Sequence, residues 1–355
     1  NMYHTFHSCF RDHVCYLKEN KIFESLPQIG YTNLLSKRWK IVPIEREDIE
    51  YITGGEVHHV LLTTTGNVLV YGDNSRGQLC VETIKNTFIE DPIELPNIKN
   101  IITIVCGWYH TACIDVENNL WMFGYNEENY TLGLGHCERV TVPQKIDSLK
   151  VKSISCGESH TLCIDMDNRV WGFGNNKYNT ISPTSEPHIT KPTKIFFFEN
   201  LIVLESSCGD NFSLCLTENN KIYGYGWNYE GCLGVEDNCT IQSPRLIHFD
   251  DESSEIIKIA SGNKTSSFID NDGGLYVLGL RSGFYPNQIN YHIPFKIKNI
   301  PPVKNVDILN NSMICKMEDG SLWTSIKNSI GVSRMRGLSG FEFMLDEFKS
   351  KQKSA

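Results

Sequence analysis

Two stretches of the chain repeat almost the same order of residues: CGWYHTACIDVENNLWMFGYN begins at Cys106, and CGESHTLCIDMDNRVWGFGNN begins at Cys156. Each contains a glycine, then a histidine, a cysteine, a turn rich in Asn and Asp, an aromatic residue and a second glycine. So many residue types recurring in one order indicate an internal repeat, so further copies should be sought along the chain.

Three further copies keep most of this order. GEVHHVLLTTTGNVLVYGDNSRGQLC begins at Gly55, GDNFSLCLTENNKIYGYGWNYEGCLG at Gly209, and GNKTSSFIDNDGGLYVLGL at Gly262. Weaker copies are CFRDHVCYLKENKIFES from Cys9 and LNNSMICKMEDGSLWTS from Leu309. The seven anchors lie near residues 9, 55, 107, 157, 209, 262 and 309, which gives a period of about 50 residues.

Each copy predicts a β-hairpin. An alternating stretch such as HTACIDV is followed by a turn and then by an aromatic-rich stretch such as NLWMFGY. The turns read KENK, TTGN, VENN, MDNR, TENN, NDGG and EDGS, and they supply the Asn, Asp and Gly residues that tolerate a positive φ. With two more strands between successive hairpins, we expect an all-β, seven-bladed β-propeller with four strands in each blade.

We expect residues 2–340 to form one closed ring, because closure removes the exposed sheet edges of an open array. Segments Met2–Phe6 and Gly331–Met344 are predicted to supply strands to one shared closing blade. Residues 341–355 carry Phe341, Leu345 and Phe348 at helical spacing, which predicts a short C-terminal helix or tail. Four aromatic side chains are expected to pack between blades: Trp121, Trp171, Tyr223 and Tyr276.

The overall composition restricts the classes of partner. The formal net charge is -9, which disfavours nucleic acid and anionic membranes as partners. No apolar run reaches the roughly 18 residues of a membrane span, and the start of the sequence lacks the pattern of a secretory signal. We therefore expect a cytoplasmic or nuclear protein that does not bind membranes.

The cysteines occupy repeat positions. One set precedes the anchor glycines and a second set follows seven residues later, and the two sets are Cys106, Cys156, Cys208 and Cys113, Cys163, Cys215. This placement favours reduced, buried side chains. The short Cys and His spacings of metal sites are missing, as are the sequence motifs of phosphate loops, zinc helices and nucleophile turns. We expect no enzymatic activity, no cofactor and no metal.

The details of the repeat resemble one known family. G-x-x-H, followed by an aromatic-G-x-N-x-x-G-x-L-G tail, is seen as YGDNSRGQLC from Tyr71 and YGWNYEGCLG from Tyr225. This pattern resembles the repeat of the regulator of chromosome condensation family. The resemblance covers about 330 residues and is most specific in the middle four copies. It implies a seven-bladed propeller whose termini meet in one blade.

The resemblance also implies several functions: guanine nucleotide exchange on a Ran-type GTPase, chromatin reading, or a plain interaction module. No segment between repeats is long enough to stand out as the wedge of the exchange factor, and no basic segment precedes the first repeat in this sequence. These departures favour a non-enzymatic platform for protein–protein interaction. The alternative is an exchange factor or another regulator of a Ran-type small GTPase.

In the family, important acidic and histidine residues lie in the loops at G-x-x-H, at one end of the central channel. The residues of this chain that match those loops are Glu56, His58, Trp108, Tyr109, His110, Glu158, His160 and Asp210. In one interpretation they form an acidic rim with an aromatic anchor, suited to a small GTPase or another protein with a basic surface. In the other, the histidines are buried hydrogen-bonding groups, the aromatic residues pack between blades and the acids are ordinary loop residues. We expect a monomer.

Overall fold

The computed structural model describes residues 5–9, 13–18, 21–25, 39–42, 44, 46–81, 88–235, 239–250, 254–279, 293–298, 300–308, 313–324 and 336–337. The predicted C-terminal helix at residues 341–355 lies outside these ranges. Within them the chain is all-β, and its strands form five four-stranded sheets and one seven-stranded sheet.

The seven-stranded sheet consists of two four-strand units that share β12 (Gln144–Cys156). Residues 144–146 of this strand pair with β11, and residues 151–156 pair with β13. The sheets are therefore consistent with the seven predicted repeats. We call the units blades 1 to 7 in chain order.

The strands of blades 1 to 3 are β1 (Thr5–Cys9), β2 (His13–Lys18), β3 (Lys21–Ser25), β4 (Trp39–Val42), β5 (Ile49–Gly54), β6 (His58–Thr63), β7 (Val68–Asp73), β8 (Phe88–Glu94), β9 (Ile101–Cys106), β10 (His110–Asp115), β11 (Asn119–Gly124) and β12. The strands of blades 4 and 5 that follow β12 are β13 (His160–Asp165), β14 (Val170–Asn175), β15 (His188–Lys194), β16 (Val203–Cys208), β17 (Phe212–Thr217), β18 (Ile222–Trp227) and β19 (Thr240–Leu246). Blades 6 and 7 comprise β20 (Ile256–Ser261), β21 (Ser266–Asp270), β22 (Leu275–Leu278), β23 (Phe295–Lys296), β24 (Val303–Ile308), β25 (Met313–Met317), β26 (Leu322–Thr324) and β27 (Arg336–Gly337). A 3-10 helix, η2 (Phe196–Phe198), lies between blades 4 and 5.

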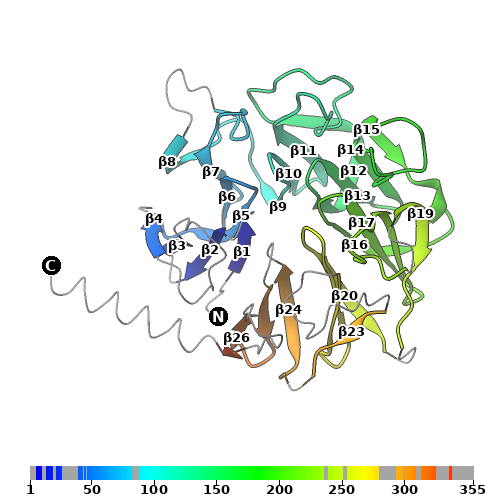
Figure 1. The fold of residues 1–355 in the computed structure, drawn as a ribbon. Coiled ribbons are helices and arrows are strands. Elements are labelled where there is room, and N and C mark those ends of the chain that lie inside the picture. Colours follow the sequence, from blue (N-terminus) through cyan, green and yellow to red (C-terminus); the bar gives the residue numbers. More distant parts are fainter. Residues whose placement is uncertain are drawn as a thin grey trace.

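The first strands of the blades form a closed ring (Figure 1). Each contacts the first strand of the next blade, and β24 of blade 7 contacts β1 of blade 1. The prediction of one shared closing blade is wrong for the described residues, because β1 pairs with β2 and β27 pairs with β26 in separate sheets. β4 and β27 give both terminal blades a fourth strand of their own, so within the described ranges these blades meet through packing and exchange no strand.

The predicted hairpin turns are confirmed by the backbone. A residue with positive φ occupies the turn of blades 2 to 7, where a left-handed backbone favours Gly or Asn. These residues are Gly66, Asn118, Asn168, Asn220, Gly273 and Gly320. Several turns also bind the next blade: Gly66 O accepts a hydrogen bond from Ile101 N at 2.9 Å, and Asn118 O accepts one from Val151 N at 2.9 Å.

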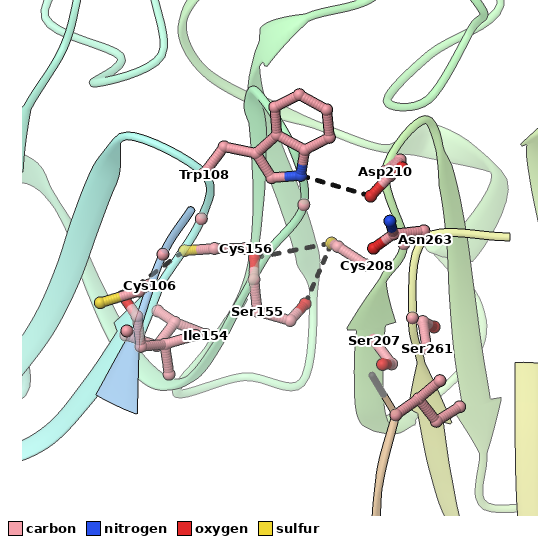
Figure 2. A pocket seen from close by; sticks show the side chains of 18 residues that line it. Cys106, Trp108, Ile154, Ser155, Cys156, Ser207, Cys208, Asp210, Ser261 and Asn263 are labelled. Atoms are coloured by element: carbon pink, nitrogen blue, oxygen red, sulfur yellow. Dashed lines mark hydrogen bonds between the residues drawn. The ribbon is translucent and has the colours of Figure 1, made fainter. Parts of the chain in front are cut away.

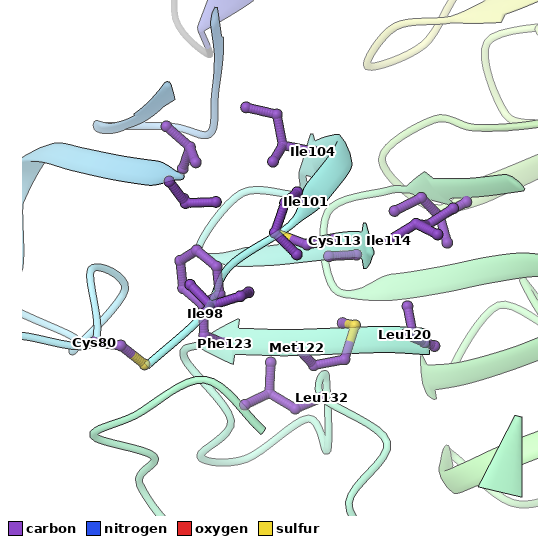
Figure 3. Packing of buried hydrophobic residues seen from close by; sticks show 14 of the residues in the cluster. Cys80, Ile98, Ile101, Ile104, Cys113, Ile114, Leu120, Met122, Phe123 and Leu132 are labelled. Atoms are coloured by element: carbon purple, nitrogen blue, oxygen red, sulfur yellow. The ribbon is translucent and has the colours of Figure 1, made fainter. Parts of the chain in front are cut away.

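Apolar side chains fill the space between neighbouring blades. One cluster extends from Val60 on β6 through Ile104 and Met122 to Phe173 on β14, and Figure 3 shows its central part. The second strand is buried along its whole length in blades 2 to 5, because both faces of each sheet are covered. A single blade would leave both faces exposed, which is why the unit is stable only as part of the ring.

The predicted aromatic packing is confirmed. Trp121 and Trp171 pack against the first cluster, Tyr223 packs against a second cluster in blades 4 to 6, and Tyr276 is buried within that second cluster. The indole nitrogen of Trp121 donates a hydrogen bond to Asp115 Oδ2 at 2.8 Å. The same bond recurs between Trp171 and Asp165, so the repeated Asp and Trp form one structural unit.

The two ends of the channel are built differently. Each first strand runs toward the anchor glycine, so the anchor loops gather at one end, which we call the mouth, and the hairpin turns gather at the opposite end. Exposed apolar side chains are found on the first strands, the turns and η2 at the opposite end. Their exposed fractions are 53% for Ile102, 59% for Val116, 51% for Met166, 71% for Phe196, 53% for Leu204 and 49% for Ile257.

Candidate functional site at the channel mouth

The anchor glycines leave room for a ring from their own blade and for the backbone of the next blade. A Cβ added to Gly107 would lie 2.1 Å from Cε1 of His110 and 2.5 Å from the carbonyl oxygen of Gly157. Gly55 and Gly157 have the same surroundings. The G-x-x-H pattern is therefore a packing requirement, which fixes the loop between glycine and histidine at the mouth.

The three predicted histidines join neighbouring blades. His58, His110 and His160 are at most 1% exposed. Each Nε2 lies within hydrogen-bonding distance of a hydroxyl group in the next blade: Thr111 at 3.3 Å, Thr161 at 3.1 Å and Ser213 at 3.1 Å, respectively. Their assignment to the partner-binding surface is wrong for this structure, because side chains buried between blades do not reach a partner.

Burial also determines the charge of two of these histidines. It lowers the pKa of His110 to about 4 and that of His160 to about 3, with a further contribution to His160 from His110. Both imidazoles are therefore neutral at pH 7. A neutral ring can take either role in its hydrogen bond to a hydroxyl, which suits a structural bridge.

A series of backbone hydrogen bonds links the anchor loops around the mouth. Glu56 N donates to Trp108 O at 2.9 Å, and Trp108 N donates to Glu158 O at 3.3 Å. Glu158 N donates to Asp210 O at 3.2 Å, and Asp210 N donates to Asn263 O at 3.4 Å. The structure therefore brings four of the predicted residues together, each contributed by a different blade.

Side-chain hydrogen bonds then connect the mouth residues in pairs. The indole Nε1 of Trp108 donates to Asp210 Oδ1 at 3.3 Å, and Asn211 Nδ2 donates to Glu158 Oε2 at 2.8 Å. The Tyr109 hydroxyl donates to Glu56 Oε2. Glu56 is only 4% exposed, so the predicted open acidic rim is in fact a partly buried cluster.

The carboxyl groups at the mouth influence one another. Burial, the nearby Glu158 and the more distant Glu56 raise the pKa of Asp210 to about 8, although Trp108 and Lys264 act in the opposite direction. Burial and Glu56 also raise the pKa of Glu158, against the hydrogen bond from Asn211. Close carboxylates with little solvent resist full ionisation, so a positive charge placed among them would be stabilised.

A cavity of about 230 Å³ lies inside the mouth. Figure 2 shows the Trp108 indole and Asp210 at its upper side, with the thiols of Cys106, Cys156 and Cys208 lower in the view. Burial raises the pKa of Cys106 and Cys208 to about 12, so these thiols are neutral and line the cavity as small apolar groups. The described cysteine side chains are free, as their repeat positions predicted.

A second set of loops, which the sequence reasoning missed, surrounds the anchor loops. Tyr125 N donates to Tyr109 O at 2.8 Å, which places the loop after β11 beside an anchor loop. The Arg76 guanidinium lies 4.6 Å from the centre of the Tyr109 ring and 5.3 Å from that of Tyr125. Such arginine and tyrosine pairs are common at the centres of protein interfaces.

Blade 5 presents a similar arrangement. The Trp227 and Tyr229 rings lie 5.6 Å apart, and Tyr229 is 52% exposed. Lys264 Nζ lies 5.0 Å from the centre of the Trp227 ring and 3.3 Å from Glu230 Oε1. The signal for these loops was the residue after each second glycine, since it differs between copies as the anchor-loop residues do.

Across the described ranges, no group of three or more His, Cys, Asp and Glu side chains is arranged to hold a metal ion. No helix in the same part of the chain is long and apolar enough to cross a membrane.

Comparison with known proteins agrees with the repeat pattern. The profile of the regulator of chromosome condensation (RCC1) repeat matches residues 65–114 and 117–164, and a second profile of that repeat matches 101–129, 151–180 and 207–232. The ultraviolet-B receptor UVR8 of Arabidopsis thaliana is 26% identical over 218 residues, which are 60% of this chain and 49% of that protein. The human E3 ubiquitin-protein ligase HERC2 is 25% identical over 55% of this chain and only 4% of its own length.

Solved structures show the same fold. Human WBSCR16 superimposes with a TM-score of 0.78 at 17% identity and covers 90% of this chain and 88% of its own. Prp20p from Saccharomyces cerevisiae, described together with its binding properties to Gsp1p and histones, has a TM-score of 0.72 at 18% identity over 83% of this chain and 78% of its own. The repeat motif and the two repeat profiles show that the chain contains repeats of the RCC1 type, and the solved structures show that it shares the fold of Prp20p.

Proposed function

We propose that this chain is a non-enzymatic protein-binding module that engages its partner through the mouth. The observation that carries the proposal is the contrast within the anchor loops of blades 2 to 5. Glycine and the ring three residues later are held by packing, whereas the two residues between them differ from blade to blade. Those variable positions supply Glu56, Trp108, Tyr109, Glu158 and Asp210.

The chemistry of the mouth supports a protein partner with a basic surface. Neighbouring carboxyl groups raise the pKa of Glu158 and of Asp210, and tyrosine, tryptophan and arginine side chains lie nearby. Electrostatic attraction raises the association rate, and aromatic anchors slow dissociation. Related structures also support protein partners, since Prp20p is described as binding Gsp1p and histones. We further propose that the chain acts as a monomer in a reducing compartment, the cytoplasm or nucleus.

Affinity capture from the native cell with two variants tests this proposal. The mouth variant carries Arg76→Ala and Tyr229→Ala, and the control carries Phe196→Ala and Leu204→Ala at the opposite end; the side chains changed in the control are more than half exposed. We expect the mouth variant to lose specific partners that the control retains. Loss only in the control variant would place the binding surface at the opposite end and contradict the proposal.

The second candidate is an exchange factor or another regulator of a Ran-type GTPase, favoured by the fold shared with Prp20p. It predicts that catalytic amounts of the protein accelerate release of a fluorescent guanine nucleotide from such a GTPase. If the nucleotide is released no faster than from the GTPase alone, the exchange factor is contradicted and the binding module remains as the proposed function. Acceleration that the mouth variant abolishes would establish the second candidate instead.

A further inference from the structure

The mouth cavity contains polar groups whose bonding capacity is unused. Ser261 lines the cavity, and its Oγ is buried without a hydrogen-bond partner among the described residues. In the same part of the chain, the carboxyl group of Asp210 accepts only the hydrogen bond from Trp108, at Oδ1. A buried polar atom without a partner costs free energy, so Ser261 Oγ points to a group supplied from outside the chain, and Asp210 Oδ2 can accept a hydrogen bond in addition to the one at Oδ1.

We propose that this cavity binds one cationic side chain, lysine or arginine, of the partner, with Asp210 as its counter-ion. The inference rests on the proposed function, because it identifies which part of the partner enters the mouth. A lysine or arginine offers several N–H donors and no acceptor, which suits a cavity lined by a carboxyl group and a hydroxyl oxygen without a partner.

The size and lining of the cavity fit such a side chain. A volume of about 230 Å³ is several times the roughly 30 Å³ that one water occupies in the liquid, so there is room for a long side chain. The neutral thiols of Cys156 and Cys208 and the side chain of Ile308 offer apolar contacts to its methylene groups. The Trp108 indole, at the upper side of the cavity, can contact the cation through its ring.

The ionisation of Asp210 couples this binding to pH. Glu158 and Glu56 raise the pKa of Asp210, Lys264 and the Trp108 hydrogen bond lower it, and burial is the largest cause of the shift to about 8. Near neutral pH the free carboxyl is therefore mostly protonated. An entering ammonium or guanidinium group stabilises the carboxylate, so binding releases a proton and the affinity rises with pH up to about 8.

The indole N–H signal of Trp108 in a nitrogen-15 NMR spectrum offers a direct test. The chain has six tryptophans, and Trp108→Phe identifies the signal of interest by its loss. The probes are Nα-acetyl-lysine methylamide and its arginine analogue, with the norleucine analogue as the match that lacks a charge. We expect saturable shifts of the Trp108 signal with the cationic probes only, and an affinity that increases by at most about tenfold per pH unit up to pH 8.

Two variants separate the charge from the fold. Asp210→Asn retains an acceptor for the Trp108 indole but removes the counter-ion. It should lower the affinity for the lysine probe at least about tenfold. Asp147→Asn removes a carboxyl that is 86% exposed and paired with Lys145, and it should leave the affinity unchanged. The other five indole signals show whether each variant remains folded.

The outcomes distinguish this inference from the proposed function. Equal shifts with norleucine, or no shift of the Trp108 signal with either cation at about 50 mM, would overturn the cationic side chain as the ligand. If partner capture still depends on Arg76 and Tyr229 in that case, the proposed function stands although the cavity does not bind a cationic side chain. A free polyamine that binds more tightly than a lysine-containing peptide would identify a small amine as the ligand and would also overturn the inference.

Discussion

The mouth and the opposite end of the channel are made from the same repeated backbone but carry different chemistry. Around the mouth, polar side chains such as Trp108 and Asp210 are half-buried and bonded to one another. At the opposite end, side chains such as Leu204 and Ile257 are apolar and about half exposed. Backbone hydrogen bonds between blades hold both ends in the same way, so the two ends differ in their side chains and not in their backbone.

Glycine substitutions should separate the two ends most strongly. Gly107→Ala at the mouth places a Cβ against His110 and the backbone of the next blade, so we expect a loss of about 3 kcal/mol in the free energy of unfolding. The control is Gly320→Ala in an opposite-end turn, where no atom lies within 4 Å and only the φ of +83° causes strain, costing about 1 to 2 kcal/mol. Urea denaturation measures both. Equal losses of unfolding free energy in the two variants would show that packing does not require a glycine at the anchor positions.

The buried histidines should make the mouth side sensitive to acid. The unfolded chain takes up protons near pH 6.5 while folded His160 does so only near pH 3, so its contribution to stability is full above pH 6.5 and falls as the pH decreases. Between pH 6.5 and 5 the loss for one such histidine is about 2 kcal/mol. His160→Phe copies Phe212, which fills the equivalent position in blade 5, and should reduce the loss by that amount. An unchanged pH profile would contradict the burial of an uncharged imidazole.

Asp210 should have the opposite pH dependence. Its folded pKa of about 8 exceeds that of an unfolded aspartate, so its contribution is present at low pH and is lost as the pH rises from about 4 through 8. Asp210→Asn should therefore be more stable than the parent protein at pH 9, by more than about 1 kcal/mol. The free energy of unfolding at pH 5, 7 and 9 checks this. A variant that is less stable at pH 9 would show that the charge is well solvated.

The smallest effect is expected at the opposite end. Leu204→Ser and Ile257→Ser change half-exposed side chains, so stability should remain within about 0.5 kcal/mol. Shifts of the Trp108 signal by the lysine probe should also be unchanged. A loss of probe binding would mean that the two ends are coupled through the channel, and the distinction between them would then fail.

The fold could be predicted from the sequence because the same turn residues, glycines and aromatic residues recur in successive copies. The four central copies carried their turn residues, their glycines and an aromatic side chain on the third strand, so residues such as Asn118 and Trp121 could be assigned from a short stretch. The gathering of Glu56, Trp108, Glu158 and Asp210 at one mouth followed from their equivalent positions in successive copies.

What the sequence did not predict depends on contacts between copies. The hydrogen-bonding partner of His110 is Thr161 in the next blade, and Glu56 accepts a hydrogen bond from Tyr109, 53 positions away. Neither distance nor burial can be read from a single copy. The second loop set was missed for another reason. Tyr125 and Trp227 follow the second glycine of their copies, where the residues differ between copies and the repeat pattern therefore gave no signal.

β12 has a mechanical consequence for the ring. This one strand of 13 residues closes blade 3 with its first part and lines the channel for blade 4 with its second part. Blades 3 and 4 are thus joined by an unbroken strand, whereas the sheets of the other blades are separate. When the ring fluctuates, we expect blades 3 and 4 to move together and neighbouring blades to separate at the other junctions. The part of the mouth between Trp108 and Glu158 should therefore deform least.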